Sequence, residues 1–221
     1  MNDQERHDDD LNEIEEIEEI DELDDEPIEA YCVSCREKVE IDNPSAVWTS
    51  QGRPGTRGEC PMCGGTVFRM GRTHLHGGSK QPPKAIKVFE SGGKGRNSRA
   101  AYIISDITQS DFADKLGEDL KKIGINVWID DGENVDETQW AGGVHPALEQ
   151  CTHLVVVLSS FALKTSTVEE AWKFFLKRRK PVALVQIEKV DPPDELRSRP
   201  RFDFTQDYKS AFRGLVEALS K

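Results

Sequence analysis

The sequence predicts an α/β fold with a five-stranded, mainly parallel sheet in its second half, preceded by a small β domain that binds a metal ion. Three observations predict this. Strand-like apolar runs alternate with helical periods beyond residue 100, which is typical of βαβ units. Four of the five cysteines form two Cys-x-x-Cys pairs. A length of 221 residues with 36% hydrophobic residues suits one medium domain and one smaller domain.

The first 29 residues form an acidic segment. They hold 16 Asp and Glu against one Arg, so the formal net charge of −12 belongs to this tail and the rest of the chain is mildly basic. Leu and Ile recur here every three residues, a spacing that drifts around a helix and cannot keep one long buried face. We therefore expect residues 1–29 to be a disordered acidic tail, with a short helix that binds a protein partner as the alternative.

The paired cysteines lie in residues 30–72 and are Cys32, Cys35, Cys60 and Cys63. A two-residue spacer lets both thiolates of a pair reach one tetrahedral ion, and four such ligands leave no open position. The segment has few apolar residues, so metal binding must supply folding energy. The pattern predicts a structural Zn²⁺ site, and the segment resembles the small zinc ribbons of prokaryotic multidomain proteins. Such ribbons often bind nucleic acid, but the modest basic excess here does not favour it.

Residues 73–99 are rich in Gly, Pro, Lys and Ser, and we expect a basic, flexible linker there. Beyond it, period-2 and continuous apolar runs predict strands at 101–105, 125–129, 153–160, 181–187 and 201–204. Apolar residues at helical spacing predict helices at 112–123, 144–148, 168–176 and 208–219, the first ending at Gly124.

The chain has no apolar stretch near the ~20 residues of a membrane-spanning helix. Its acidic N-terminus also differs from the positively charged start of a signal peptide. We therefore expect a cytoplasmic protein without membrane contact.

Three motifs follow one another in residues 100–221. A strand ending in Ile103-Ile104-Ser105-Asp106 precedes Ser110-Asp111-Phe112-Ala113-Asp114-Lys115-Leu116. Next come Leu120-x-x-x-Gly124-Ile125-x-Val127-Trp128-Ile129-Asp130 and, further on, Cys151-Thr152-His153 with Val155-Val156-Val157-Leu158-Ser159-Ser160. Together they resemble TIR (Toll/interleukin-1 receptor) domains of the prokaryotic type. The resemblance implies the TIR fold, a flavodoxin-like five-stranded parallel sheet, and homo-oligomers formed through TIR–TIR contacts.

Many TIR domains of this kind cleave the nicotinamide–ribose bond of NAD⁺ with a glutamate on the helix after the third strand. The run Thr165-Ser166-Thr167-Val168-Glu169-Glu170-Ala171-Trp172 aligns with that motif without a gap only when Ala171 occupies the glutamate position. A carboxylate there would stabilise the positive charge that develops on the ribose carbon. The resemblance therefore implies an NAD⁺ glycohydrolase or cyclase of a prokaryotic defence or signalling system, disabled at its catalytic position.

Three interpretations of position 171 remain open. The alanine is natural and the domain is inactive, or it replaces a glutamate of the natural protein, or Glu170 is the catalytic carboxylate instead. Glu170 is turned by about 100° from Ala171 on a helix, so it substitutes only after a shift of register. The alternative function is a non-enzymatic adaptor or scaffold that acts by protein–protein association.

In open α/β sheets a ligand binds outside the carboxyl ends of the strands. The polar residues expected there are Ser105, Asp106, Asp130, Asp131, Ser159 and Ser160. We expect them to line the NAD⁺ pocket, with ordinary turn and loop positions as the alternative. Trp140 lies in a Gly- and Asp-rich loop where no core period requires it. We expect it to stack on the substrate base or to anchor a neighbour, with local packing as the alternative.

Overall fold

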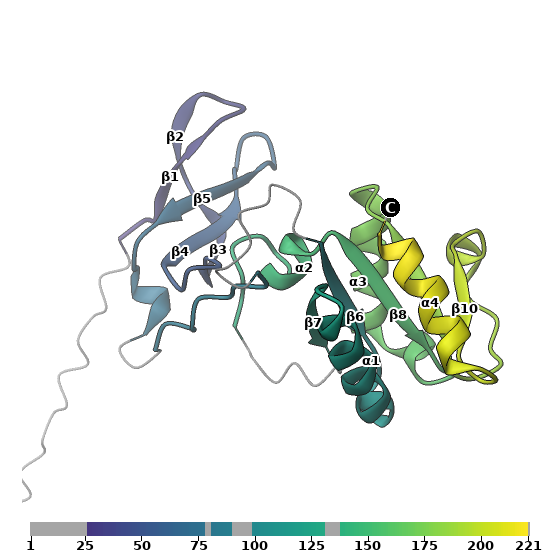
Figure 1. Cartoon of the computed structure of the whole chain (residues 1–221). Helices are drawn as coiled ribbons and strands as arrows, with labels where there is room; N and C mark the ends of the chain where they lie inside the picture. The colour runs from purple at the N-terminus through teal and green to yellow at the C-terminus, as the bar shows by residue number, and fades with distance from the viewer. Residues whose placement is uncertain (1–25, 78–80, 90–98, 131–137, 221) are drawn as a thin grey trace, which may run out of the picture.

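The structure is a computed structural model that describes residues 26–77, 81–89, 99–130 and 138–220. It contains a small antiparallel β domain and a larger α/β domain (Figure 1). Most of the expected acidic tail, residues 1–25, and the candidate site residue Asp131 lie outside the described residues. The division of the chain at residues 29, 72 and 99 stays a prediction.

The small β domain has a two-stranded and a three-stranded antiparallel sheet. Its strands are β1 (Glu29–Cys32), β2 (Glu37–Glu40), β3 (Asp42–Trp48), β4 (Pro54–Glu59) and β5 (Thr66–Met70). The Cys-x-x-Cys pairs form the turns between β1 and β2 and between β4 and β5. Seven buried residues make up its apolar core, and two of these are cysteines: Ile28, Ala30, Cys32, Val39, Ile41, Cys60 and Val67. A core this small favours metal binding as a source of stability.

The α/β domain is built on a five-stranded parallel sheet in the order β10-β9-β8-β6-β7. The strands are β6 (Ala100–Ile104), β7 (Asn126–Asp130), β8 (His153–Leu158), β9 (Val182–Gln186) and β10 (Arg201–Asp203). Counted within the domain the order is 2-1-3-4-5, so the predicted flavodoxin-like sheet is confirmed. The chain direction across the sheet reverses between β6 and β8, and the carboxyl ends of these strands form the edge where a ligand is expected.

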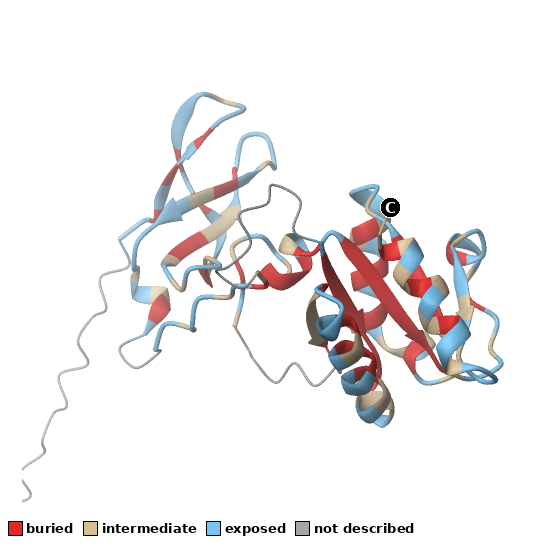
Figure 2. Ribbon diagram, viewed as in Figure 1, coloured by how far each residue is buried: buried red, intermediate tan, exposed pale blue. Residues whose placement is uncertain are grey.

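Helices cover both faces of this sheet (Figure 1). On one face α1 (Ser110–Lys122) and α4 (Tyr208–Leu219) pack over alternate residues of the strands. On the other face lie α2 (Pro146–Gln150) and α3 (Ser166–Lys177). All six residues of β8 are buried (Figure 2), as its continuous apolar run predicts. Gly124 follows α1 with a φ of 85°, a left-handed conformation that ends the helix at the predicted residue.

Residues 81–89 pack against the α/β domain, although they belong to the segment expected as a linker. Val88 is only 7% exposed and joins the core on the α2 and α3 face. Gln150 binds this segment from both sides, because its side-chain amide donates to Ile86 O at 3.0 Å and its Oε1 accepts from Val88 N at 3.3 Å. Ile86 N donates to Ser50 O at 2.9 Å, so the same segment also contacts the β domain.

A short backbone pairing joins the two domains directly. Trp48 N, at the end of β3, donates to Gln139 O, and Ala141 N donates back to Trp48 O, both at 2.8 Å. The pairing forms a parallel bridge between Trp48 and Trp140, whose side chains are 6% and 9% exposed. Two large buried side chains therefore accompany the hydrogen bonds at this junction. Across the described residues, no helix has both the length and the apolar character needed to cross a bilayer.

Candidate functional site

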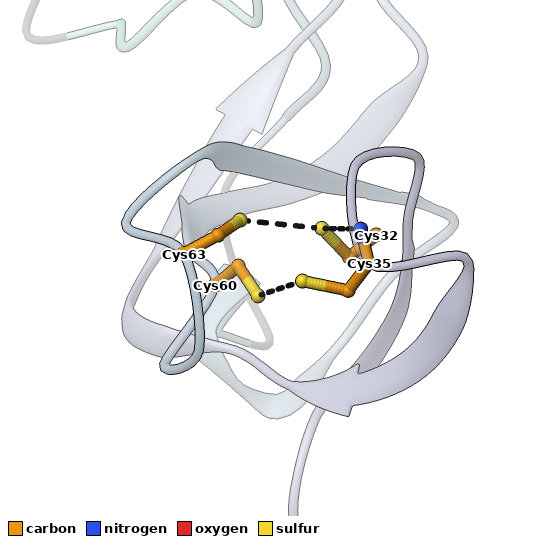
Figure 3. Close-up of side chains that lie close together, drawn as sticks. All are labelled: Cys32, Cys35, Cys60 and Cys63. Carbon is orange, nitrogen blue, oxygen red and sulfur yellow. Dashed lines mark hydrogen bonds between the residues drawn. The ribbon is translucent and has the colours of Figure 1, made fainter.

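The four paired cysteines converge in the β domain, as Figure 3 shows. Their sulfur atoms all lie within 4.8 Å of one another, with 3.6 Å between Cys32 and Cys63 and 3.8 Å between Cys35 and Cys60. These separations are far longer than a disulfide bond of about 2.05 Å. They match the roughly 3.8 Å between two sulfurs that each lie about 2.3 Å from one tetrahedral zinc ion. The cluster could therefore bind a metal ion such as zinc.

The environment of the cluster also suits thiolate ligands. The backbone N–H of Cys35 donates to Cys32 Sγ at 3.5 Å, and this hydrogen bond lowers the pKa of Cys32 to about 7. Hydrogen bonding with Cys63 and the other thiols raises the pKa of Cys35, because deprotonating several adjacent thiols concentrates negative charge. A divalent cation would offset that charge, so the sulfurs fit a metal ion better than four separate thiols.

A cavity of about 410 Å³ lies where the β domain meets the α/β domain. Its walls come from β3 and β4, from β6 and β7, from residues 138–148 and from the first half of α3. The lining residues that carry charged, polar or aromatic side chains are Ser45, Arg57, Tyr102, Asp130, Thr138, Gln139, Trp140, His145, Thr167 and Glu170. A volume in the range of 300–1,000 Å³ is typical of small-molecule sites.

Two of the lining residues share a buried hydrogen bond. The Tyr102 hydroxyl donates to Asp130 Oδ2, which is 7% exposed at the carboxyl end of β7. Burial, together with the charge of Asp130, raises the pKa of Tyr102 above its ordinary value, so the phenol keeps its proton. The Asp130 carboxylate is therefore oriented by a hydrogen bond from the neutral Tyr102 phenol.

Two neighbouring positions of α3 line the same cavity. Ala171 is 4% exposed and belongs to the core, yet its side chain also forms part of the cavity wall. Glu170 is exposed and lines the cavity as well. Of the residues expected in the NAD⁺ site, the structure thus brings Asp130, Trp140, Glu170 and Ala171 together around one space.

The other expected residues lie outside the lining of this cavity. Asp106 and Ser159, at the carboxyl ends of β6 and β8, are buried and joined by a 2.5 Å hydrogen bond from Ser159 Oγ to Asp106 Oδ2. Ser160 donates through its backbone N–H and its hydroxyl to the Glu188 carboxylate. Ser105 is fully buried, and its hydroxyl has no hydrogen-bond partner among the described residues. Their part in binding NAD⁺ stays a prediction.

Asp106 is expected to stabilise the fold. Burial alone would raise the pKa of Asp106, but hydrogen bonds from Ser159 and Thr108 lower it below its ordinary value. Replacing Asp106 with Asn should lower the free energy of unfolding by about 1–3 kcal/mol at pH 7, since buried donors lose a charged acceptor. The depressed pKa makes this contribution complete above the unfolded-state value of about 3.9, and it should be lost as the pH falls through the folded-state value.

Urea unfolding of both proteins at neutral and acid pH measures this difference. Asp114→Asn, at an exposed position of α1, is the matched control and should change stability by less than about 0.5 kcal/mol. A difference between Asp106→Asn and the parent that stays constant from neutral to acid pH would contradict the assigned role.

Three residues that shape the cavity escape the sequence patterns. Tyr102 is the one aromatic residue of an aliphatic strand, a weak signal for a polar group at a buried position. His145 directly follows Val144 and gives no signal of its own; the centre of its ring lies 5.2 Å from that of Trp128 and 5.5 Å from that of Trp140. Arg57 comes from the other domain, so only the tertiary structure reveals its place in the lining.

Comparisons with known protein families match two separate parts of the chain. A family model described as a domain of unknown function (DUF5679) matches residues 31–70, which include all four paired cysteines. A second family model, described as a TIR domain, matches residues 105–216, just over half of the chain. No curated protein matches the chain.

Two solved structures are similar to part of this chain. The TIR domain of the Toll-related receptor TRR-2 from Hydra magnipapillata is 15% identical with a TM-score of 0.47, and the match covers 57% of this chain and 100% of that one. A response regulator receiver domain protein from Bacillus halodurans is 13% identical with a TM-score of 0.35, over 55% of this chain and 97% of that one. With its parallel sheet in the flavodoxin-like order and the family match over residues 105–216, the chain belongs to the TIR domain family.

Proposed function

We propose that the TIR domain is of the NAD⁺ glycohydrolase or cyclase type and that the cavity at the domain junction is its substrate site. One observation carries this proposal. Position 171, where the family motif places a catalytic glutamate, lines the same cavity as Asp130 and Trp140. The cavity thus combines carboxylates for the ribose with aromatic side chains for a base. Ala171 itself has no carboxylate, so we expect little or no turnover from this chain.

The proposed reaction breaks the bond between the ribose carbon and the nicotinamide nitrogen. Nicotinamide leaves with the bonding electron pair and becomes neutral, and positive charge develops on the ribose. Water then bonds to the ribose carbon and loses a proton, which gives ADP-ribose; attack by a nitrogen of the adenine gives a cyclic product instead. A glutamate at position 171 would stabilise the charge on the ribose, and Trp140 would pack against the nicotinamide or adenine ring.

Ala171→Glu tests this proposal. We expect the variant to release nicotinamide from NAD⁺ about 10²–10³-fold faster than the parent chain, which is typical of one electrostatic group acting on a transition state. Chromatography of nicotinamide and ADP-ribose at several protein concentrations measures the rate. A dependence on concentration would support TIR self-association as part of the active state.

Glu170→Gln separates the two candidate carboxylates, because both positions line the cavity. When Glu170→Gln is added to Ala171→Glu, the rate of nicotinamide release should change by no more than a few-fold. Turnover by the parent chain that disappears in Glu170→Gln would assign the reaction to Glu170. If Ala171→Glu folds and shows no turnover even at high protein concentration, the enzymatic proposal fails.

A non-enzymatic adaptor is the alternative, and the alanine at position 171 favours it. In that function the TIR domain associates with other TIR domains or with itself, and the β domain or the acidic tail recruits a protein partner. The defence or signalling context belongs to the enzymatic proposal and shares its test. Analytical ultracentrifugation of the parent chain, which needs no catalysis, measures self-association for either function.

We also propose that Cys32, Cys35, Cys60 and Cys63 hold a structural Zn²⁺. All four positions of a tetrahedral ion would be filled by sulfur, which leaves none for substrate or water. The ion would hold the two cysteine turns together and so fix the sheet that carries Arg57. The ion would therefore stabilise the β domain and would take no part in cleavage.

A further inference from the structure

The β domain contributes directly to the lining of the cavity. Ser45 and Val47 on β3 and Arg57 on β4 face the space that Asp130, Trp140 and Ala171 line from the other side. The Ser45 hydroxyl donates to Arg57 O at 3.1 Å, which ties the two strands together at this point. The backbone pairing of Trp48 with residues 139–141 holds β3 beside the TIR domain. The cavity is therefore shared by both domains.

Arg57 is the one lining residue with a permanent positive charge. Its guanidinium lies over the backbone of Gly143, where an added Cβ would come within 2.6 Å of Nη1. Gly143 has a φ of 75°, so glycine suits both the turn and the close approach of the arginine. The lack of a side chain at Gly143 therefore leaves room for the guanidinium beside the loop.

The guanidinium makes no ion pair with any described residue, although Asp130 and Glu170 line the same cavity. Asp130 accepts from the Tyr102 hydroxyl instead. Arg57 is also half-buried, so part of its hydration is already lost. A half-buried guanidinium that faces a cavity can bind an anionic ligand, and its parallel donors match two oxygens of a phosphate group.

We propose that Arg57 of the β domain binds the phosphate groups of the nucleotide that occupies this cavity, so that ligand recognition requires both domains. The identity of that nucleotide as NAD⁺ rests on the proposed function. Arg57 would then set the preference for a phosphate-bearing ligand over the bare nucleoside, while Trp140 and Asp130 contact the base and ribose. The cysteine cluster would support this role, because Cys32 ends β1 and Cys60 directly follows β4, so a bound ion would join these two strands.

Calorimetric titration of the full chain, loaded with zinc, tests the inference with three probes: NAD⁺, inorganic pyrophosphate and nicotinamide riboside, which has no phosphate. Arg57→Gln should weaken binding of NAD⁺ and pyrophosphate about 10- to 100-fold, the range expected when charge-assisted hydrogen bonds are lost. Binding of nicotinamide riboside should not change. Arg69→Gln is the matched control, because Arg69 is exposed on β5 of the same sheet and does not line the cavity.

Arg57→Lys provides a second variant that keeps the charge but loses the paired donors. It should weaken NAD⁺ binding several-fold, and it replaces Arg57→Gln if that variant does not fold, as judged by zinc content and circular dichroism. Unchanged NAD⁺ and pyrophosphate affinity in the folded variant overturns the inference, as does a parent chain that binds neither.

These outcomes are separable from those of the proposed function. If Ala171→Glu cleaves NAD⁺ and adding Arg57→Gln changes neither KM nor kcat, the enzymatic proposal stands and the proposed role of Arg57 fails. Arg57-dependent binding of pyrophosphate, together with an inactive Ala171→Glu, retains the composite anion site and rejects NAD⁺ cleavage.

Discussion

Cys60→Ser is expected to release the zinc ion proposed at the cysteine cluster and to unfold the small β domain. Cys60 is 1% exposed, belongs both to the thiol cluster and to the seven-residue core, and directly follows β4. A serine hydroxyl is a poor ligand for zinc, and three remaining sulfurs leave the site open to water. Since the apolar core is too small to offset the ordering of the domain, loss of the metal should remove most of its stability.

The expected loss is on the order of 10 kcal/mol of metal-binding free energy, the scale known for structural zinc in small domains. Inductively coupled plasma mass spectrometry of the purified protein should give about one zinc per parent chain and far less for Cys60→Ser. Hydrogen exchange should show loss of protection in β1 to β5 while β6 and β8 keep theirs, because the TIR core is a separate cluster.

Cys151→Ala is the matched control for this experiment. Cys151 is equally buried but lies in the TIR core beside α2, away from the thiol cluster. Burial raises the pKa of Cys151 to about 12, so it stays a neutral, apolar thiol. The variant should bind as much zinc as the parent. A Cys60→Ser protein with full metal content and an intact β domain would contradict the structural role of the cluster.

Trp140→Ala is expected to separate the two domains. Trp140 is 9% exposed, packs against His145 and pairs through its backbone with Trp48. Removing a buried tryptophan side chain costs about 3–5 kcal/mol in lost apolar contact and residual cavity. Most of that cost should fall on the junction, because Trp140 belongs to neither apolar core of the α/β domain.

Hydrogen exchange at the amides of Trp48 and Ala141 reads the junction directly, since these two groups donate across it. Both should exchange faster in Trp140→Ala, while amides of β8 remain protected. Trp172→Ala is the matched control: Trp172 is 5% exposed within the TIR core, so its loss should destabilise that domain instead. Equal exchange of Trp48 and Ala141 in Trp140→Ala and the parent would show that the side chain does not hold the junction.

The elements of the TIR domain could be predicted because local periodicity determines them. Phe112, Leu116 and Leu120 recur at helical spacing, and α1 forms with Leu116 and Leu120 fully buried. The continuous apolar run of β8 likewise predicts the strand buried on both faces. The cysteine spacing predicts the cluster for a similar reason, because two-residue turns bring each pair of sulfurs together locally.

The grouping of the candidate site residues could be predicted only in part. The predicted strands end at one edge of the sheet, and four of the expected polar residues lie there: Ser105, Asp106, Asp130 and Ser159. The strand pattern does not reveal that Ser159 donates a hydrogen bond to Asp106 while Asp130 lines the cavity. That division depends on which face of the sheet each side chain points to and on what packs there.

Helical geometry alone also gives an incomplete expectation for position 171. A turn of about 100° between adjacent residues suggests that Glu170 and Ala171 cannot serve the same site. Both line the cavity together with Thr167, which lies three and four residues earlier, so one face of α3 about 100° wide borders the cavity.

By itself, the sequence determined the α/β class, the order of the elements, the cysteine cluster and the resemblance to TIR domains. These features depend on spacing within single segments, where side-chain period and backbone geometry act over a few residues. The tertiary structure alone decided that the β domain lines part of the cavity and that Arg57 shares it with Asp130 and Ala171. Such contacts join segments far apart in the chain, and they form only where two folded surfaces fit together.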